Sequence, residues 1–447
     1  MKYISSFAAA GLIVGVATTA HADLTIKNVT LYDGTGATAR AGVTVVVKGD
    51  RISEVAPGAK TRGKVIDGDG KYLIPGLMDA HIHLPGGQTG NVNNPSERRL
   101  VVDKPTGMKY LHGYLYVGVT AVYDSSNNPD YIFAMREDEQ KGRIVSPRIF
   151  GAGGIITVPN GYASGPAALK VETWDQARAE LDKRLLAKPD MLKIAMDRQG
   201  ILAQPAVPGL SNDMFAQIVQ YAASKGVRST VHIAAEADAD AVINAGVSAL
   251  AHPVWRSIAN DSFIKLAAAK KIPIATTLSY LGNIARVQDD PGFWDDPLYR
   301  ATIDPEEVER GKTTERQRYQ DNGMSPMMKL MLPHAMRNTK RLHDAGAVLA
   351  LGTDRTQPPA VHQELEFLVK AGISPFDTIR IATLNAAAYV GRDKDFGSIE
   401  AGKWADMVLL DADPAADVAN FRTIAAVIKG GKEIDRSKLD IQANRKK

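Results

Sequence analysis

Eight short apolar segments alternate with amphipathic helical patterns between residues 76 and 396, and this alternation constrains the fold more than any other feature. Repeated strand–helix units are typical of a parallel sheet, and eight of them predict a closed (β/α)8 barrel of the TIM type. The expected strands are Leu77–Leu84, Val119–Ser125, Arg148–Gly153, Met191–Met196, Ser229–Ala234, Ala249–Pro253, Ile272–Leu278 and Val348–Asp354.

The segments between these strands include clear helical patterns. One helix is predicted over Asp213–Lys225, with Asn212 as its N-cap and Gly226 as its C-cap. The longest connection, Ser279–Met324, is polar and carries Trp294 and Tyr299. We expect it to be a helical insertion over the mouth of the barrel.

Both ends of the mature chain have a different sequence pattern, in which short β-strand segments are separated by turn residues. Examples are Leu24–Leu31 near the start and Ile424–Lys429 near the end, the latter followed by the turn residues Gly430-Gly431. We therefore expect residues 23–75 and 397–447 to form one small β-sandwich domain beside the barrel domain, residues 76–396.

The first 22 residues have the layout of a secretory signal peptide. Lys2 precedes an apolar stretch from Phe7 to Ala17, and Ala20-His21-Ala22 is a small-x-small cleavage pattern. The apolar stretch is too short to span a bilayer, which needs about 20 residues. We expect cleavage after Ala22, a periplasmic or secreted protein, and no membrane anchor.

Composition excludes several classes of site and partner. The chain has 54 Lys and Arg against 50 Asp and Glu, and no run of like charge suited to nucleic acid. It has no cysteine, which excludes disulfides, thiolate metal sites and a thiol nucleophile. We expect a small-molecule substrate, and the sequence leaves open whether the protein is a homo-oligomer.

His81-Ile82-His83 ends the first expected barrel strand. Side chains two residues apart in a strand share a face, so both imidazoles can point into the barrel. Two neighbouring imidazoles are a natural start for a metal site.

Four further polar residues lie in or near the C-terminal halves of other expected strands, where barrel enzymes place their active sites. Lys193 interrupts an apolar strand, where an unpaired amine is costly. The others are His232, His252 and Asp354. Six such residues at one end of the barrel predict a joint site.

The sequence at this point resembles the amidohydrolase superfamily, close to the imidazolonepropionase-like metal-dependent hydrolases and their dipeptidase relatives. The resemblance covers nearly the whole mature chain. It is carried by Ile74-Pro75-Gly76-Leu77-Met78-Asp79-Ala80-His81-Ile82-His83, Gly352-Thr353-Asp354, Ser374-Pro375 and Gly397-Ser398-Ile399-Glu400-Ala401-Gly402-Lys403-Trp404-Ala405-Asp406.

The resemblance implies a binuclear metal centre. It makes His81 and His83 ligands of the first metal ion, together with Asp354, and makes His232 and His252 ligands of the second. Lys193 is implied to be carboxylated and to bridge both ions, since a carbamate is a carboxylate and an amine cannot bridge cations. Imidazole and carboxylate ligands favour zinc, with manganese, cobalt or iron as alternatives. The implied nucleophile is a hydroxide shared by the two ions, with Asp354 as general acid and base.

Two segments depart from the pattern of many relatives. Thr157–Gly165 has Tyr162 near the position of an expected histidine, and Asp197-Arg198-Gln199-Gly200 replaces a small-residue turn. Tyr162, Arg198, Tyr280 and Arg355 follow strand ends, and we regard them as candidates for contact with a substrate carboxylate or carbonyl.

The function that best fits these features is hydrolysis of an amide, in a dipeptide or an N-acyl amino acid, by an exported enzyme. A lactonase or a phosphotriester hydrolase on the same binuclear centre is the alternative within enzymes. A metal-free, non-catalytic scaffold is the alternative outside them.

Overall fold

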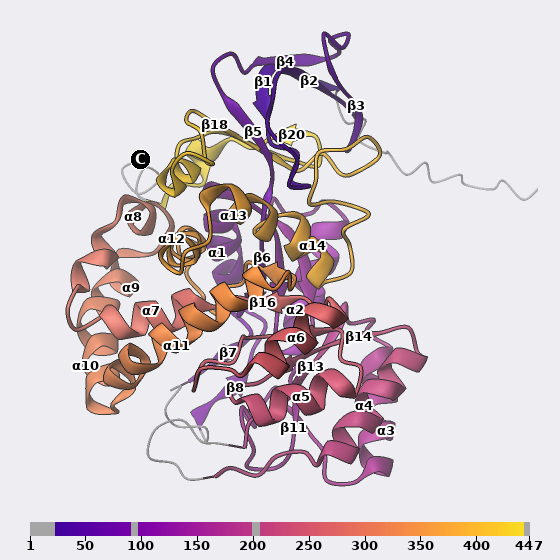
Figure 1. The fold of residues 1–447 in the computed structure, drawn as a ribbon, viewed down its shortest axis with the longest axis vertical. Helices are drawn as coiled ribbons and strands as arrows, with labels where there is room; N and C mark the ends of the chain where they lie inside the picture. The colour runs from indigo at the N-terminus through magenta and orange to yellow at the C-terminus, as the bar shows by residue number, and fades with distance from the viewer. Residues whose placement is uncertain (1–22, 91–96, 199–205, 442–447) are drawn as a thin grey trace, which may run out of the picture.

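The computed structural model describes residues 23–90, 97–198 and 206–441. The expected signal peptide and its cleavage site, up to Ala22, lie outside this part. Figure 1 shows two regions, a small sheet at the top that contains both ends of the described chain, and a larger barrel surrounded by helices. None of the helices described is both long and apolar enough to cross a bilayer.

The eight predicted barrel strands are all present, although several are shorter than expected. They are β6 (Leu77–Ile82), β9 (Val119–Asp124), β10 (Arg148–Gly151), β13 (Met191–Ala195), β14 (Arg228–His232), β15 (Ala249–Leu250), β16 (Ile274–Ala275) and β17 (Leu349–Ala350). The strands pair in parallel within two sheets, β10-β9-β6 and β12-β11-β13-β14-β15-β16-β17. The short strands β11 (Ile156–Thr157) and β12 (Leu169–Lys170) extend the second sheet.

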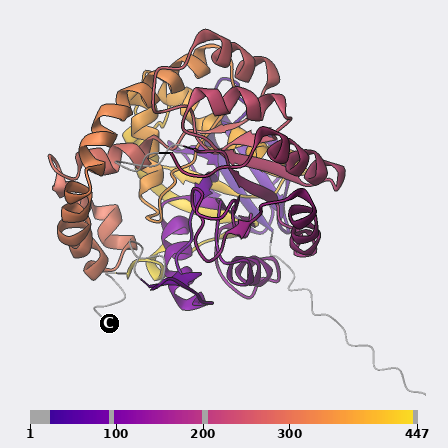
Figure 2. The ribbon, with the colours of Figure 1, turned by 90° about the horizontal axis from the view of Figure 1, so that it is seen from below.

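Backbone hydrogen bonds join the two sheets at both gaps. The N–H of Ala80 donates to the carbonyl of Leu351, and the N–H of Asp190 donates to the carbonyl of Gly151. Seen from below, the helices form a ring around the strands (Figure 2). The predicted TIM-like barrel is therefore confirmed.

Burial on both faces explains why the longest barrel strands are apolar runs and do not alternate. Every residue of β6, β9 and β13 is buried, because helices cover the outer face and packed side chains fill the inner one. Asp79 and Lys193 are exceptions to the apolar pattern within these strands, and both lie at the site described below.

The outer helices follow the strands in alternation. They are α1 (Lys104–Tyr116), α2 (Pro129–Gln140), α3 (Trp174–Leu185), α4 (Asn212–Ser224), α5 (Glu236–Asn244), α6 (Asp261–Lys270), α7 (Leu278–Arg286), α11 (Met324–Asp344), α12 (Ala360–Lys370), α13 (Pro375–Ile381) and α14 (Leu384–Tyr389). Both predicted caps of α4 are wrong by one residue, and the C-cap is Lys225, not Gly226. Ser211 is the N-cap, because its hydroxyl accepts from the N–H of Met214, whereas Asn212 begins the helix and accepts from Arg198.

The insertion between β16 and β17 is helical, as predicted. Beyond α7 it contains a 3₁₀-helix (Pro291–Asp295), α8 (Pro297–Thr302), α9 (Pro305–Arg310), a π-helical turn (Gly311–Glu315) and α10 (Arg316–Asp321). Phe293, Trp294 and Tyr299 belong to a separate apolar cluster within it. The insertion contacts α1 through the ion pair of Lys109 with Asp304, so it packs against the side of the barrel.

Strands from both ends of the chain join one eight-stranded mixed sheet. Its order is β20-β19-β18-β5-β1-β2-β3, with β4 also paired to β1. The strands are β1 (Leu24–Leu31), β2 (Arg40–Lys48), β3 (Arg51–Pro57), β4 (Lys64–Asp67), β5 (Tyr72–Pro75), β18 (Met407–Leu410), β19 (Ile424–Lys429) and β20 (Lys432–Glu433). The sheet has its own apolar core, which includes Ile26, Val45 and Met407. Both ends of the chain contribute strands to this sheet, as predicted. The sandwich arrangement and the domain limits stay predictions.

A largely buried charge pair connects the barrel to this sheet. Asp406, just before β18, accepts hydrogen bonds from Nε and Nη2 of Arg148 at 2.6 and 3.2 Å and from the N–H of Gly430 at 2.6 Å. The guanidinium of Arg148 also lies 3.8 Å from the ring centroid of Trp404. The side chains of Arg148 and Asp406 are only 14% and 2% exposed.

We expect Asp406→Ala to lower the free energy of unfolding by about 3–5 kcal/mol, because it leaves the buried guanidinium without its partner. Urea unfolding at pH 7 measures this change. Asp411→Ala is the matched control, because Asp411 forms an ion pair with Lys71 at an exposed position, where the cost should be at most about 1 kcal/mol. Equal costs in the two variants would contradict a stabilising role for the link.

Candidate metal centre

The six predicted metal ligands line one cavity of about 440 Å³ at the carboxyl ends of the barrel strands. His81 and His83 come from β6 and the residue after it, Lys193 from β13, and His232 from β14. His252 and Asp354 follow β15 and β17. All except His83 and Asp354 are buried. The structure therefore brings together residues that are up to 273 positions apart, from 81 to 354.

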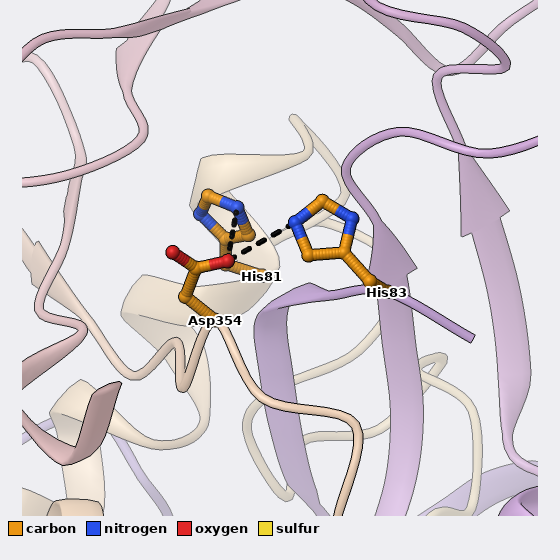
Figure 3. A group of neighbouring side chains, drawn as sticks. All are labelled: His81, His83 and Asp354. Carbon is orange, nitrogen blue, oxygen red and sulfur yellow. Dashed lines mark ion pairs between the residues drawn. The ribbon is translucent and has the colours of Figure 1, made fainter. Parts of the chain in front are cut away.

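Three of the six residues form a tight group (Figure 3). Oδ1 of Asp354 lies 3.0 Å from Nε2 of His83 and 3.4 Å from Nε2 of His81. One nitrogen or oxygen atom from each of the three side chains lies within 4.8 Å of the others. Imidazole nitrogen and carboxylate oxygen are ligands that zinc and related divalent ions accept, so the donor set fits such a cation.

Hydrogen bonds at the opposite ring nitrogens orient these imidazoles. Nδ1 of His81 lies 3.0 Å from the carbonyl of Ala251, and Nδ1 of His83 lies 3.1 Å from the carbonyl of Ser126. A carbonyl can only accept, so each Nδ1 carries a proton, and Nε2, which faces Asp354, is the nitrogen available to a metal ion. This arrangement is the usual support of histidine ligands, and it strengthens the fit to a metal ion.

Lys193 lies beside this group in the interior of the barrel. Its Nζ is 2.9 Å from Oγ of Ser125 and 3.4 Å from Nε2 of His81. Burial lowers the pKa of Lys193 to about 7, so a neutral amine is accessible near neutral pH. A neutral amine is the form that combines with carbon dioxide, and the position therefore suits the implied carbamate.

His252 and His232 continue the cluster away from Asp354. The ring of His252 lies 4.8 Å from that of His81 and 4.7 Å from that of His232. Nε2 of His252 is 3.9 Å from Oδ2 of Asp354, and its Nδ1 is 3.0 Å from the hydroxyl of Thr277. The Nε2 atom of His252 therefore faces the Asp354 carboxylate.

His232 has a second neighbour that the sequence analysis did not identify. Its Nε2 lies 3.4 Å from Oδ2 of Asp197, which in turn accepts a hydrogen bond from Arg256 at 3.1 Å. Tyr162 stacks on the imidazole of His232, with ring centroids 4.0 Å apart. Asp197 and Tyr162 belong to the two segments that depart from the pattern of relatives, so these departures gather around His232.

The backbone of Asp354 is in the left-handed region, with φ of 52°. Aspartate and asparagine adopt this conformation more readily than other residues that carry a side chain. The N–H of Asp354 donates to the carbonyl of His81 at 2.8 Å, which fixes the position. Burial opposes ionisation of Asp354, but His81, His83 and His252 hold the pKa of its carboxyl well below its usual range.

A buried carboxyl group connects the strand of His81 to the segment that carries Asp354. Oδ1 of Asp79 accepts from the N–H of His81 at 3.1 Å and from the N–H of Thr353 at 3.0 Å. Its Oδ2 accepts from the hydroxyl of Thr353 at 2.7 Å. Glu364 plays a similar part nearby, accepting from the first N–H groups of α7. Asp79 is therefore a positioning residue for two expected ligands.

We expect Asp79→Ala to lower the free energy of unfolding by about 2–4 kcal/mol, because three buried donors lose their acceptor. The rate of the enzyme should fall by about 10–100-fold, as for other residues that orient ligands. Asp79→Asn is the matched control. Its Oδ1 can accept from both N–H groups and its amide can donate to Thr353, so we expect stability within about 1 kcal/mol of wild type. Urea unfolding and kcat/KM test both variants, and equal losses would contradict the hydrogen-bonding explanation.

Of the four predicted substrate contacts, only Tyr162 lines the cavity. Arg198 instead donates to the carbonyl of Leu210 and to Asn212. Arg355 follows Asp354 but turns toward the insertion, where Tyr319 and Tyr299 lie near its guanidinium. Tyr280 begins the first turn of α7 and is partly buried outside the cavity lining. A position after a strand end does not determine the direction of the side chain, and a role of these four residues in substrate contact stays a prediction.

Several residues that line the cavity were not predicted, and Gln88 and Arg98 are two of them. Gln88 and Arg98 come from the hairpin of β7 (Gln88–Thr89) and β8 (Arg99–Leu100), which follows the first barrel strand. Each strand of this hairpin has two residues, so the sequence offers no periodicity that could identify it. None of the residues of the insertion 279–324 is among the described residues that line the cavity, and its expected place over the mouth of the barrel stays a prediction.

Comparisons with known proteins show which family and which fold the chain resembles. The model of the amidohydrolase family matches residues 72–434. An imidazolonepropionase of Shouchella clausii is 40% identical over 80 residues, which are 17% of this chain and 18% of that protein. An adenine deaminase of Klebsiella pneumoniae is 25% identical over 403 residues, 87% of this chain and 53% of that protein. The chain thus matches well under two thirds of the length of these curated relatives.

A solved structure shares the fold over nearly the whole chain. The structure of a putative prolidase from Bifidobacterium longum superimposes with a TM-score of 0.72 and 25% identity, covering 95% of this chain and 99% of that one.

Proposed function

Because the chain belongs to the amidohydrolase family, we propose that it is an exported, binuclear metal-dependent hydrolase that cleaves an amide bond in a dipeptide or an N-acyl amino acid. The observation that carries the proposal is the convergence of two oriented imidazoles on the Asp354 carboxylate, with Lys193 and two further histidines in the same cavity. The likeness to a putative prolidase supports an amide substrate.

In this proposal His81, His83 and Asp354 hold one divalent ion, His232 and His252 hold the other, and carboxylated Lys193 contacts both. Zinc suits this ligand set. When bound, such ions supply Lewis acidity that polarises a carbonyl group and makes water more acidic.

The residues of the chain supply the rest of the chemistry. Backbone carbonyls orient the rings of His81 and His83 so that Nε2 of each faces the Asp354 carboxylate. One oxygen of that carboxylate can take a proton from the attacking water and later give it to the leaving amine. Tyr162 stands on the cavity wall, where its hydroxyl can contact the substrate. Export is proposed from the basic residue Lys2, the apolar stretch Phe7–Ala17 and the cleavage pattern before Asp23.

A hydrolysis screen of the zinc-loaded protein tests the proposed function. The panel contains dipeptides, N-acyl amino acids, lactones and phosphotriesters, and elemental analysis of the same sample measures metal content. We expect amide hydrolysis and close to two divalent ions per chain. Hydrolysis of lactones or phosphotriesters alone would reject the amide substrate, and a metal-free protein without activity would favour a scaffold.

A further inference from the structure

The hairpin of β7 and β8 forms a charged part of the cavity wall that the chemistry above does not use. It lies on the side of the barrel away from the small sheet (Figure 1). Arg98 precedes β8 and lines the same cavity as the predicted metal ligands. Lys193 is the one other lysine or arginine among the described residues that line this cavity, and it belongs to the metal centre.

The guanidinium of Arg98 has no hydrogen-bond acceptor or carboxylate partner among residues 23–90, 97–198 and 206–441. Its side chain is nevertheless partly buried, which withdraws the charge from some of its water. A Cβ atom built on Gly165 would lie 3.2 Å from Nη1 of Arg98, so the glycine leaves the space in which the guanidinium lies. A charged fork held at a cavity wall without a partner suits an anion that arrives with a ligand.

Gln88, on the paired strand of the same hairpin, points to a ligand independently. Its Oε1 is buried, and no hydrogen-bond donor reaches it within the described part of the chain. Buried polar atoms are almost always hydrogen-bonded, so an unpaired one in a cavity wall indicates a missing partner. An amide or amine N–H of a ligand would supply the donor.

The wall beside these two residues is apolar and built from small side chains. Ile155 lies just before β11, whereas Ala163, Ala167 and Ala168 lie between β11 and β12. All four line the cavity together with Gly165. Small side chains leave room for a larger apolar group of the ligand, and its burial would be favourable.

We propose that this wall recognises the carboxylate of the amino acid that the reaction releases. Arg98 binds the carboxylate through its guanidinium fork, Gln88 accepts from an adjacent N–H group, and the alanine wall takes an apolar side chain. This inference rests on the proposed function and deepens it, because it names the residues that bind the carboxylate shared by dipeptides and N-acyl amino acids. It also assigns the anion contact to Arg98, since Arg198 and Arg355 do not line the cavity and are engaged elsewhere.

Equilibrium binding tests the proposal without depending on turnover. The probes are N-methylsulfonyl-L-phenylalanine and its carboxamide, which differ only in the carboxylate and contain no carboxylic amide at the acyl position. Isothermal titration calorimetry compares them on the zinc-loaded wild type, on Arg98→Met and on Arg98→Lys. Arg337→Met is the control, because Arg337 is an exposed arginine on α11 that does not line the cavity.

We expect the wild type to bind the acid at least about tenfold more tightly than the carboxamide. Arg98→Met should weaken binding of the acid by about 10–100-fold and leave the carboxamide within about threefold. Arg98→Lys should lie between, because lysine keeps the charge but not the fork. Arg337→Met should bind both probes as the wild type does.

The proposal is overturned if the wild type binds neither probe or shows no preference for the acid. It is also overturned if Arg98→Met weakens both probes equally, or weakens neither, while thermal melting shows that the variant is folded. If Arg98→Met is unfolded, the test rests on binding of the two probes by Arg98→Lys and on the preference of the wild type for the acid. Because binding is measured apart from hydrolysis, a protein that prefers the acid yet cleaves no amide would reject the proposed function alone.

Discussion

Lys193→Ala should lower kcat by about 10³-fold or more and remove close to one metal ion per chain. Lys193 is buried at 3% exposure between Ser125 and His81, where only its carbamate could contact two ions. A bound metal ion contributes several kcal/mol to rate, which corresponds to about three orders of magnitude. The substitution also empties the volume of the lysine side chain, so formate, acetate or propionate should restore part of the activity and of the metal content. Steady-state kinetics with and without these acids, together with elemental analysis, measure the effect.

The matched control is Lys329→Ala, which removes an exposed lysine paired with Asp289 on the surface. It should keep wild-type activity and should not respond to added acids. Wild-type activity in Lys193→Ala would show that Lys193 is only a strand residue. A fully active wild type that contains a single ion per chain would reject the bridging role.

The barrel could be predicted because its strands are apolar runs with a helix after each. The runs around Val119–Asp124 and Met191–Ala195 are buried on both faces, and this requirement is visible in the residue types themselves. The lengths of the later strands could not be predicted. Ile274–Ala275 and Leu349–Ala350 are strands of only two residues each, and the chain adopts left-handed conformations soon after them, at Thr277 and Asp354.

The candidate site likewise has features that could be predicted from the sequence and features that could not. The spacing of His81 and His83 and the position of Asp354 at a strand end follow from strand geometry, so their convergence was predictable. The carbonyls of Ala251 and Ser126, which orient the two imidazoles, could not be identified, because every residue has a carbonyl. Arg98 was missed for a related reason. Arg98 directly precedes a strand of only two residues, which is too short to give a periodic pattern in the sequence. Only the three-dimensional structure shows which cavity its side chain lines.

Asp197 shows most clearly which site residues could not be predicted from the sequence. Asp197 and Arg198 stand where relatives have a small-residue turn, and Arg198 is the one predicted to contact the substrate. In the structure Arg198 points toward α4, whereas Asp197 faces His232 and pairs with Arg256. Neighbouring side chains in an irregular segment point in different directions, and no sequence periodicity predicts which of them points into the site.

Asp354→Asn should lower kcat by about 10²–10⁴-fold while much of the metal stays bound. The asparagine has the same size, keeps one oxygen that can face His83 and His81, and tolerates the φ of 52° that the backbone requires. What it lacks is an oxygen that can accept and return a proton near neutral pH. The loss should therefore appear in kcat more than in metal content or in the free energy of unfolding.

Steady-state kinetics and elemental analysis of the same Asp354→Asn preparation measure the two quantities together. Asp124→Asn is an informative control, because Asp124 is a buried carboxyl at the end of β9 that accepts from Leu84 and Asn127 and does not line the cavity. It should affect stability more than rate, since its hydrogen bonds hold the backbone after His83. If Asp354→Asn keeps both metal ions and turns over at close to the wild-type rate, proton transfer by Asp354 is wrong, and the residue acts as a ligand alone.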